Sequence, residues 1–469
     1  MSKLPLAEIA TRSVAFVGES LARFENLLRD NEHYLARNER QIFSSLEQRA
    51  AEIRTRLFRR VTTLVAARDK KHELGLARST VEATPIYSSI VELHRDLRHV
   101  PIPALRRESE VFVRSLWCRL QTMPSAKSEE PAALHLSHDL IHGQHNVRNG
   151  PAVIDLPKLD YAAPLTWPLI LHEVAHSTLP PVDVPPNLSP IVSSWLIEAG
   201  CDRLAFRICG PSYLAAFALR TFVDRTYLVG TNRHPPGRLR LEAFESCVPP
   251  SKTPTALFDV VSSVIADRAK ASEVGGVKLQ EAGSRTLSCQ SCKKPYTLIE
   301  TTEAETTFVA VLPDYIRQLD EQLATLRHVT PDDAHCAQLA SQLKSKQLIG
   351  ASHNQATAES EFQKLQQVIK AQRPGDPIGE PAVKQLEVVV TSLLDQPNDL
   401  LDVITGAWIN YFDSASDEAF KILGAASPDA NGEMWERYKA RVRQFDDLLL
   451  ASIETAHFHG FIGINNAVE

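Results

Sequence analysis

Apolar residues recur at helical spacing over two long stretches near the two ends of the chain. Both patterns step by three, four or seven positions, and this periodicity predicts amphipathic helices. The first stretch covers about residues 17–68 and contains no Pro and, after Gly18, no Gly, so it predicts a coiled coil or a long helical hairpin. Its apolar positions are Leu21, Phe24, Leu28, Leu35, Ile42, Leu46, Ile53, Leu57, Val61 and Leu64. From about residue 300 onward the apolar positions are Ile316, Leu319, Leu323 and Leu326, then Trp435, Tyr438, Val442, Phe445 and Leu449.

Prolines divide the remaining helical pattern. A second helical stretch is predicted over about 86–122, broken at Pro101 and Pro103, because proline disfavours helix at itself and at the preceding residue. The C-terminal helical region has breaks at 374–377 and at Ser427-Pro428. No internal repeat of fixed period is present. These flanks are expected to pack as helices around the middle of the chain.

The middle, about 130–250, has shorter apolar runs and clustered prolines. A strand is predicted over 152–156, followed by a helix that begins near Pro164. A proline-rich loop, 179–190, then leads into a helix over 191–209, which Gly210-Pro211 ends as a glycine cap followed by proline. The fold class expected is α+β, predominantly helical, with a small sheet in a minimal core between long helical flanks.

Composition narrows the class of protein. The chain has 469 residues, of which 43% are hydrophobic and 23% charged, with a formal net charge of -6. These values are typical of soluble globular proteins and exclude disordered, collagen-like and disulfide-scaffold classes. Residues 1–120 carry 21 Lys and Arg against 15 Asp and Glu. Because both signs are mixed along predicted helices, we expect a solvated face there and no nucleic-acid partner.

Seven sparse cysteines indicate a reducing compartment. The first twenty residues lack the apolar segment of a signal peptide. No stretch approaches the 18 or more apolar residues of a membrane span. A cytoplasmic protein without membrane spans is therefore expected.

The segment that carries chemistry is WPLILHEVAHSTLP, which contains the HExxH motif His172-Glu173-Val174-Ala175-His176. Residues i and i+4 lie on one face of a helix, so both imidazoles can bind one zinc ion. Glu173 lies beside the metal position, where it can take a proton from a water on the metal.

The next predicted helix supplies acidic partners. Glu198 is the candidate third ligand, which leaves a fourth position open, as a catalytic zinc site requires. Asp202 lies one turn further along and can accept the other N–H of a zinc-binding histidine. HExxH followed by ExxxD resembles the gluzincin metallopeptidases, the thermolysin-like clan. By this resemblance Glu198 binds zinc and Asp202 braces a histidine, most often the first one.

A third motif narrows the resemblance. Asn232-Arg233-His234-Pro235-Pro236 precedes an arginine, Arg240, six residues after the histidine. The order HExxH, ExxxDRxA, HPP and Arg is similar to the HtpX and CAAX-prenyl-protease branch of gluzincins, whose members are embedded in membranes. By resemblance, His234 helps stabilise the oxyanion and Arg240 braces the acidic helix or the substrate. Cys201 stands where that branch usually has alanine, and the resemblance covers only about residues 150–245.

The sequence thus predicts a zinc-dependent metallopeptidase that hydrolyses an intracellular polypeptide. Four regions are expected: a helical, coiled-coil-like region over 1–128, a zincin core over 129–250, an irregular segment over 251–300, and a helical region over 301–469. The helical flanks are candidates for binding a regulatory protein. The alternatives are a zincin-derived, non-catalytic helical scaffold protein and a helical nucleic-acid-associated protein that binds through the basic region, residues 1–120. The non-catalytic scaffold is disfavoured because the sequence retains every zinc ligand and the catalytic base. The nucleic-acid-associated protein is disfavoured because the net charge of the whole chain is close to neutral.

Other chemical signals have plainer interpretations. The single CxxC at Cys289 and Cys292 is half of a structural zinc site, and no spacing rule supports a second pair. For these two cysteines a plain loop with two thiols is the favoured interpretation. Two other interpretations stay open: ligands of a second, structural zinc ion, and a redox-active pair. Cys201 and Cys209 are expected to be inert buried thiols. A cluster of four histidines is expected to lie in a loop, and two tyrosines are further candidates for oxyanion donors. The clustered histidines are His135, His138, His142 and His145, and the tyrosines are Tyr213 and Tyr227.

Overall fold

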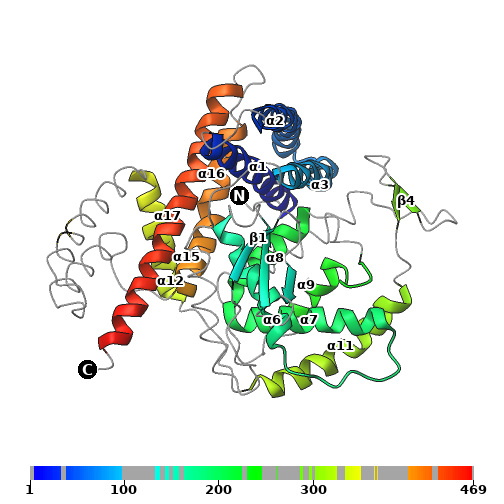
Figure 1. Ribbon diagram of the computed structural model, residues 1–469. Helices are drawn as coiled ribbons and strands as arrows, with labels where there is room; N and C mark the ends of the chain where they lie inside the picture. Colours follow the sequence, from blue (N-terminus) through cyan, green and yellow to red (C-terminus); the bar gives the residue numbers. More distant parts are fainter. Residues whose placement is uncertain are drawn as a thin grey trace.

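Helices make up most of the part of the chain that the structure, a computed structural model, describes (Figure 1). This confirms the predicted helical character. The described residues are 5–32, 39–97, 133–137, 143–146, 152–157, 163–223, 230–245, 286–288, 295–297, 302–324, 333–349, 400–424 and 431–466, with the single positions 261, 364 and 367.

Three N-terminal helices pack against one another. They are α1 (Pro5–Asn31), α2 (Glu39–Asp69) and α3 (Glu73–Asp96), and each contacts the other two. The first predicted stretch is therefore two packed helices, as in a hairpin. The Asn31 side chain donates to the carbonyl of Leu27 at 2.7 Å, which satisfies one free carbonyl at the end of α1.

The second predicted helix has different bounds from those expected. α3 begins at Glu73, well before residue 86, and it contains Pro85. Proline was expected to mark breaks, but tertiary packing holds this one inside a helix, and the Tyr87 side chain that follows it is buried. The expected breaks at Pro101 and Pro103 lie outside the described residues.

The C-terminal helices complete the core that the N-terminal ones begin. α17 packs along α1. The predicted apolar positions, which lie mainly on α1, α2, α11 and α17, are buried, except for Ile42 and Ile316, which are partly buried. Leu35 and Leu326 lie outside the described residues. A charged contact crosses the same interface, where Arg23 donates to both carboxylate oxygens of Asp446 at 2.8 and 3.0 Å. These helices are α11 (Thr302–Gln322), α12 (Asp333–Ile349), α15 (Leu400–Asn410), a π-helix η5 (Tyr411–Ala415), α16 (Ser416–Gly424) and α17 (Asn431–Asn466).

The described strands form two small sheets. The first has the order β1-β3-β2, in which β3 pairs parallel with β1 and antiparallel with β2. β4 and β5 form a separate antiparallel pair. The strands are β1 (Ala133–Ser137), β2 (Gly143–Asn146), β3 (Ala152–Pro157), β4 (Thr286–Ser288) and β5 (Pro295–Thr297).

The expected loop around the histidine cluster is partly wrong. His135 lies in β1 and His145 in β2, because backbone pairing with β3 overrides the weak strand preference of Gly143 and Asn146. His138 and His142 lie outside the described residues, as do Cys289 and Cys292.

The middle segment folds into short helices around the HExxH motif. The helix predicted from Pro164 starts as a 3-10 turn and becomes α-helical only at Ile170. Helix α8 starts at Pro211, directly after α7. The elements are η3 (Pro164–Leu169), α6 (Ile170–Thr178), α7 (Pro190–Cys209), α8 (Pro211–Val223) and α9 (Gly237–Glu245).

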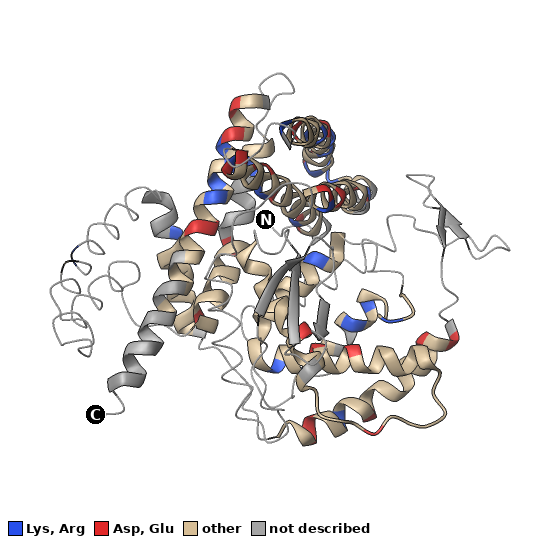
Figure 2. Cartoon of the chain, viewed as in Figure 1, with Lys and Arg blue, Asp and Glu red and all other residues tan. Residues whose placement is uncertain are grey.

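The middle helices share their surroundings with both flanks. α8 packs against α1, α3 and α15, and α11 lies along α7. The expected region boundaries at 128, 250 and 300 therefore stay predictions, since the described helices on either side are in contact. Figure 2 shows Lys and Arg intermingled with Asp and Glu on α1 to α3. None of the described helices is long and apolar enough to cross a membrane.

Candidate metal centre

The helix that carries HExxH is short and lies deep in the protein. Two prolines remove backbone donors from η3, so a buried 3-10 turn leads into α6. α6 packs between α7 and the strands β2 and β3. His172 and Glu173 are buried, while His176 is partly exposed at the end of α6. The motif therefore presents its side chains to the interior with one edge open.

Helix α7 faces α6 with three functional side chains. The helix starts at Pro190 after the Ser189 hydroxyl accepts from the N–H of Val192 at 3.3 Å. Glu198, Cys201 and Asp202 stand at i, i+3 and i+4, so they share one face of the helix. All three are buried, and that face lies against the two histidines.

Glu198 lies between the two imidazoles of HExxH. Nε2 of His172 is 3.0 Å from one carboxylate oxygen of Glu198, and Nε2 of His176 is 3.6 Å from the other. With zinc–ligand bonds of 2.0–2.1 Å, neighbouring ligand atoms of a tetrahedral site lie about 3.3 Å apart. The two rings meet edge to face with centroids 4.9 Å apart. The Glu198 carboxylate therefore lies within reach of an ion that the two histidines could hold.

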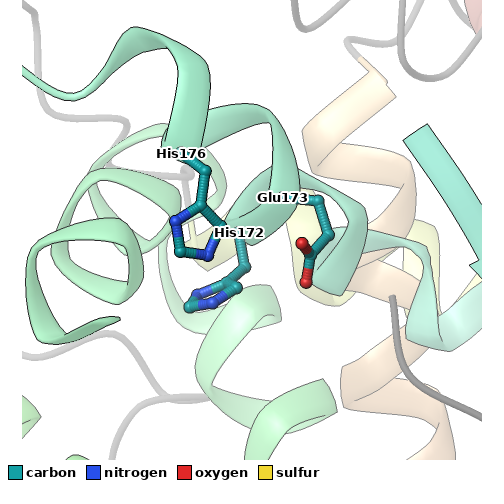
Figure 3. A group of neighbouring side chains, drawn as sticks. All are labelled: His172, Glu173 and His176. Atoms are coloured by element: carbon teal, nitrogen blue, oxygen red, sulfur yellow. The ribbon is translucent and has the colours of Figure 1, made fainter. Parts of the chain in front are cut away.

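A second carboxylate belongs to the same cluster. Glu173 lies beside both histidines, and the three ligand atoms are all within 4.8 Å of one another (Figure 3). The environments of the two carboxylates differ: burial raises the pKa of Glu173, whereas the pKa of Glu198 is lowered to about 2 despite its burial, because it accepts a hydrogen bond from His172. His172, Glu173 and His176 are thus a group that could hold a metal ion.

Asp202 is the centre of a buried network behind His172. Its carboxylate lies 2.8 Å from Nδ1 of His172 and accepts two hydrogen bonds of 2.6 Å from the Arg240 guanidinium. The hydroxyl of Tyr213 donates to it at 2.6 Å. Arg240 also stacks over the ring of Phe217, 4.5 Å from its centroid. The network fixes the ring of His172 so that Nε2 points at Glu198.

Electrostatics within this network are strong. Burial opposes the charge on His172, but the neighbouring Asp202 carboxylate raises the pKa of this histidine to about 10. Burial also opposes the charge on Asp202, yet Arg240 and His172 hold its pKa well below the usual range. Burial and the charge on His172 lower the pKa of His176 to about 4. Of the two histidines of the motif, His172 therefore holds its proton more tightly.

Cys201 contacts Nδ1 of His176, as Asp202 contacts Nδ1 of His172. Its sulfur lies 3.3 Å from Nδ1 of His176. Burial raises the pKa of the Cys201 thiol well above its usual range, so the group stays a neutral thiol. A histidine that binds a metal through Nε2 carries its proton on Nδ1, and sulfur is the acceptor in reach.

A tight turn brings His234 to the other side of Glu198. Nε2 of His234 is 3.4 Å from the same Glu198 oxygen that lies near His172. The hydroxyl of Thr231 accepts from the backbone N–H groups of Arg233 and His234 at 3.2 and 2.9 Å. Trp195 of α7 donates its indole N–H to the carbonyl of Thr231 at 2.9 Å. The turn is thereby tied to the helix that carries Glu198.

The structure brings seven of the predicted site residues together. Tyr213, a candidate oxyanion donor, is fully buried and donates instead to Asp202. Tyr227, the other candidate, lies outside the described residues. Two roles were missed: the contact of Cys201 with His176, for which the position beside Asp202 was a signal, and the turn formed by Thr231. The seven residues are His172, Glu173, His176, Glu198, Asp202, His234 and Arg240.

No family model matches the chain, and no curated protein or solved structure matches it either. The resemblance to gluzincins therefore stands on the motifs and on the group that they place together.

Proposed function

We propose that the protein is a zinc-dependent metallopeptidase that hydrolyses peptide bonds of an intracellular polypeptide. One observation carries this proposal: Nε2 of His172, Nε2 of His176 and the Glu198 carboxylate converge at separations of 3.0 and 3.6 Å, with Glu173 beside them. Two imidazoles and a carboxylate form the ligand set of catalytic zinc sites. When bound, zinc supplies Lewis-acid activation of water for attack on a carbonyl group.

Glu173 is the proposed general base. It is buried next to both histidines. Glu198 lies between the two imidazoles, and Glu173 does not. From this place its carboxylate takes a proton from the attacking water and later gives it to the leaving amine. The pKa of Glu173 is raised and that of Glu198 is lowered, which fits a proton-accepting role for Glu173 and a metal-binding role for Glu198.

Asp202 and Arg240 are proposed as bracing residues, and His234 as the donor to the oxyanion. Asp202 accepts from Nδ1 of His172 and is itself held by Arg240 and Tyr213. Such outer partners orient a metal-binding histidine and increase its basicity. His234 stands across Glu198 with its imidazole partly exposed, where a substrate carbonyl can reach it.

The fold around the site is compatible with a minimal zincin core. Helix α6 packs against the sheet strands β2 and β3, and α7 brings the third ligand from the next helix. We propose that this arrangement places the chain in the gluzincin group, with the closest likeness of motif order to the HtpX and CAAX-prenyl-protease branch. The peptidase would then act in the cytoplasm, and the helical flanks are candidate sites for a regulatory partner.

Glu173→Gln tests the proposal most directly. The substitution keeps size and hydrogen bonding but cannot accept the proton. Zinc content and melting temperature should stay close to wild type, while cleavage falls by at least about 100-fold. The substrate should first be found by profiling new peptide termini in cells that express wild type or Glu173→Gln.

The alternative function, a non-catalytic scaffold, gives a different result. Cells with wild type and with Glu173→Gln would then show the same peptide termini, although both proteins bind zinc. A substrate cut equally well by both proteins would show that the activity does not use this site. A protein that stays metal-free after incubation with zinc would overturn the proposal itself.

A further inference from the structure

Three imidazoles, and not only the two of HExxH, surround the Glu198 carboxylate. Their Nε2 atoms lie 3.0, 3.6 and 3.4 Å from its oxygens, for His172, His176 and His234 respectively. All three separations are close to the spacing of about 3.3 Å between neighbouring ligands of a tetrahedral zinc ion. On this measure His234 is as well placed toward Glu198 as either histidine of the motif.

The placement of His234 is built into the fold. Its turn is closed by a backbone hydrogen bond of 2.8 Å from Thr231 to the carbonyl of His234. The Thr231 hydroxyl accepts two further N–H groups within the turn. Gly230 packs so closely that a Cβ there would lie 2.9 Å from Pro236 and 3.0 Å from Trp195. The turn is therefore fixed against α7, and its histidine is directed at Glu198.

We infer that His234 is a fourth protein ligand of the metal ion in the resting protein, through Nε2. This inference rests on the proposed zinc site and adds to it a donor that HExxH and Glu198 do not supply. A site with four protein ligands is closed, whereas a catalytic zinc site keeps one position for water or substrate. The resting protein is then latent, and a substrate has to displace His234.

Exposure and backbone setting together identify His234 as the donor that can leave. The side chains of His172 and Glu198 are 8% and 9% exposed, whereas those of His176 and His234 are 27% and 34% exposed. His234 lies on a turn, while the other donors lie on packed helices. After displacement Nε2 takes up a proton from water, and the imidazole, still next to the reacting carbonyl, can then donate in the proposed oxyanion role. One residue thus closes the site and later assists the reaction.

X-ray absorption at the zinc edge tests this inference, because it counts the imidazoles bound to zinc without any substrate. The wild-type protein should show three imidazoles and His234→Ala two. The zinc dissociation constant of His234→Ala, measured by competition with a chelator, should rise at least about tenfold, since even the loss of an outer partner costs that much. Arg233→Ala, an exposed neighbour in the same turn, is the matched control and should keep three imidazoles.

A second pair of variants tests the turn. Thr231→Val removes the hydroxyl that accepts the N–H groups and should reduce the third imidazole signal, while Thr231→Ser should retain it. Two imidazoles in wild type, unchanged in His234→Ala, would overturn the inference and leave the proposed peptidase intact. A protein in which neither His172 nor His176 binds zinc would remove both proposals.

Discussion

The sulfur of Cys201 lies 3.3 Å from Nδ1 of His176, directly beside the residue that holds Nδ1 of the other histidine of the motif. Consecutive residues of α7 thus each orient one of the two imidazoles. A thiol is a weak acceptor and a carboxylate a strong one, so the two histidines are held unequally.

Replacing Cys201 should reveal this contact in metal binding. Cys201→Ala removes the acceptor and should raise the zinc dissociation constant by about tenfold, at the low end of the effect of outer partners. Cys201→Ser keeps an acceptor and should stay close to wild type. Competition with a chromogenic chelator measures both. An alanine variant that binds zinc as tightly as wild type would mean that the thiol only fills space.

Asp202→Asn should be more severe. The amide cannot supply the charge that makes His172 basic, and it leaves the Arg240 guanidinium buried without its charged partner. Zinc affinity should fall about 10- to 100-fold, and the melting temperature should drop as well. Tyr213→Phe removes one hydrogen bond and retains the charge, so its effect should be smaller. Equal zinc affinities in Asp202→Asn and wild type would contradict the bracing role.

Helix α11 is tied to α7 through one carboxylate. Asp320 accepts from Arg203 at 3.0 and 2.7 Å and from Arg207 at 3.4 Å. Asp320→Asn leaves Arg203, which is nearly buried, with a weaker partner and should lower the free energy of unfolding by about 1–3 kcal/mol. Asp314→Asn, an exposed position on the same helix, should have almost no effect. Chemical denaturation compares the two, and equal stabilities would show that the ion pair does not hold α11.

Glu19 should make stability depend on pH. Burial, together with the nearby Asp446 carboxylate and against the pull of Arg23, raises the pKa of Glu19 from 4.5 to about 7. A folded pKa above the unfolded one means that the folded state holds the proton more tightly. The stabilisation is therefore complete below about pH 4.5 and is lost as pH rises through 7. The loss is on the order of 3 kcal/mol.

Glu19→Gln imitates the protonated side chain at every pH. Its melting temperature should match wild type near pH 4.5 and exceed it at pH 8. Thermal unfolding across this range, followed by circular dichroism, gives the comparison. Parallel curves for the two proteins would show that Glu19 does not titrate in this window.

The sequence was most informative where a function follows from spacing within one helix. HExxH on α6 and the ExxxD spacing on α7 each place their side chains on one face, whatever surrounds the helix. The glycine at 210 was also a reliable signal: it ends α7 with φ of 59° and lets α8 start at once, which brings Tyr213 back to Asp202. Local rules were sufficient for these features.

Features that depend on distant partners were not predictable. The position of Cys201 beside Asp202 indicated that it lies near the site, but it did not indicate which side chain the thiol contacts, because His176 comes from another helix. The break between α1 and α2 carries no Pro or Gly, and the helical period continues across it. β2 forms from poor strand residues, because β3 supplies the hydrogen bonds. In each case a tertiary contact, rather than local preference, decided the outcome.

The pairing of α1 with α17 also has a consequence for biosynthesis. Arg23 and Asp446 meet across this interface, so α1 packs against a helix whose contacting residue is made 423 positions later in the chain. Until α17 has been made, residues such as Leu21 and Phe24, which the folded protein buries completely, have part of their partner surface missing. The nascent chain must keep this apolar face away from other chains during synthesis, a period in which chaperones are most needed. Completion of this helical core therefore has to wait until α17 has been synthesised.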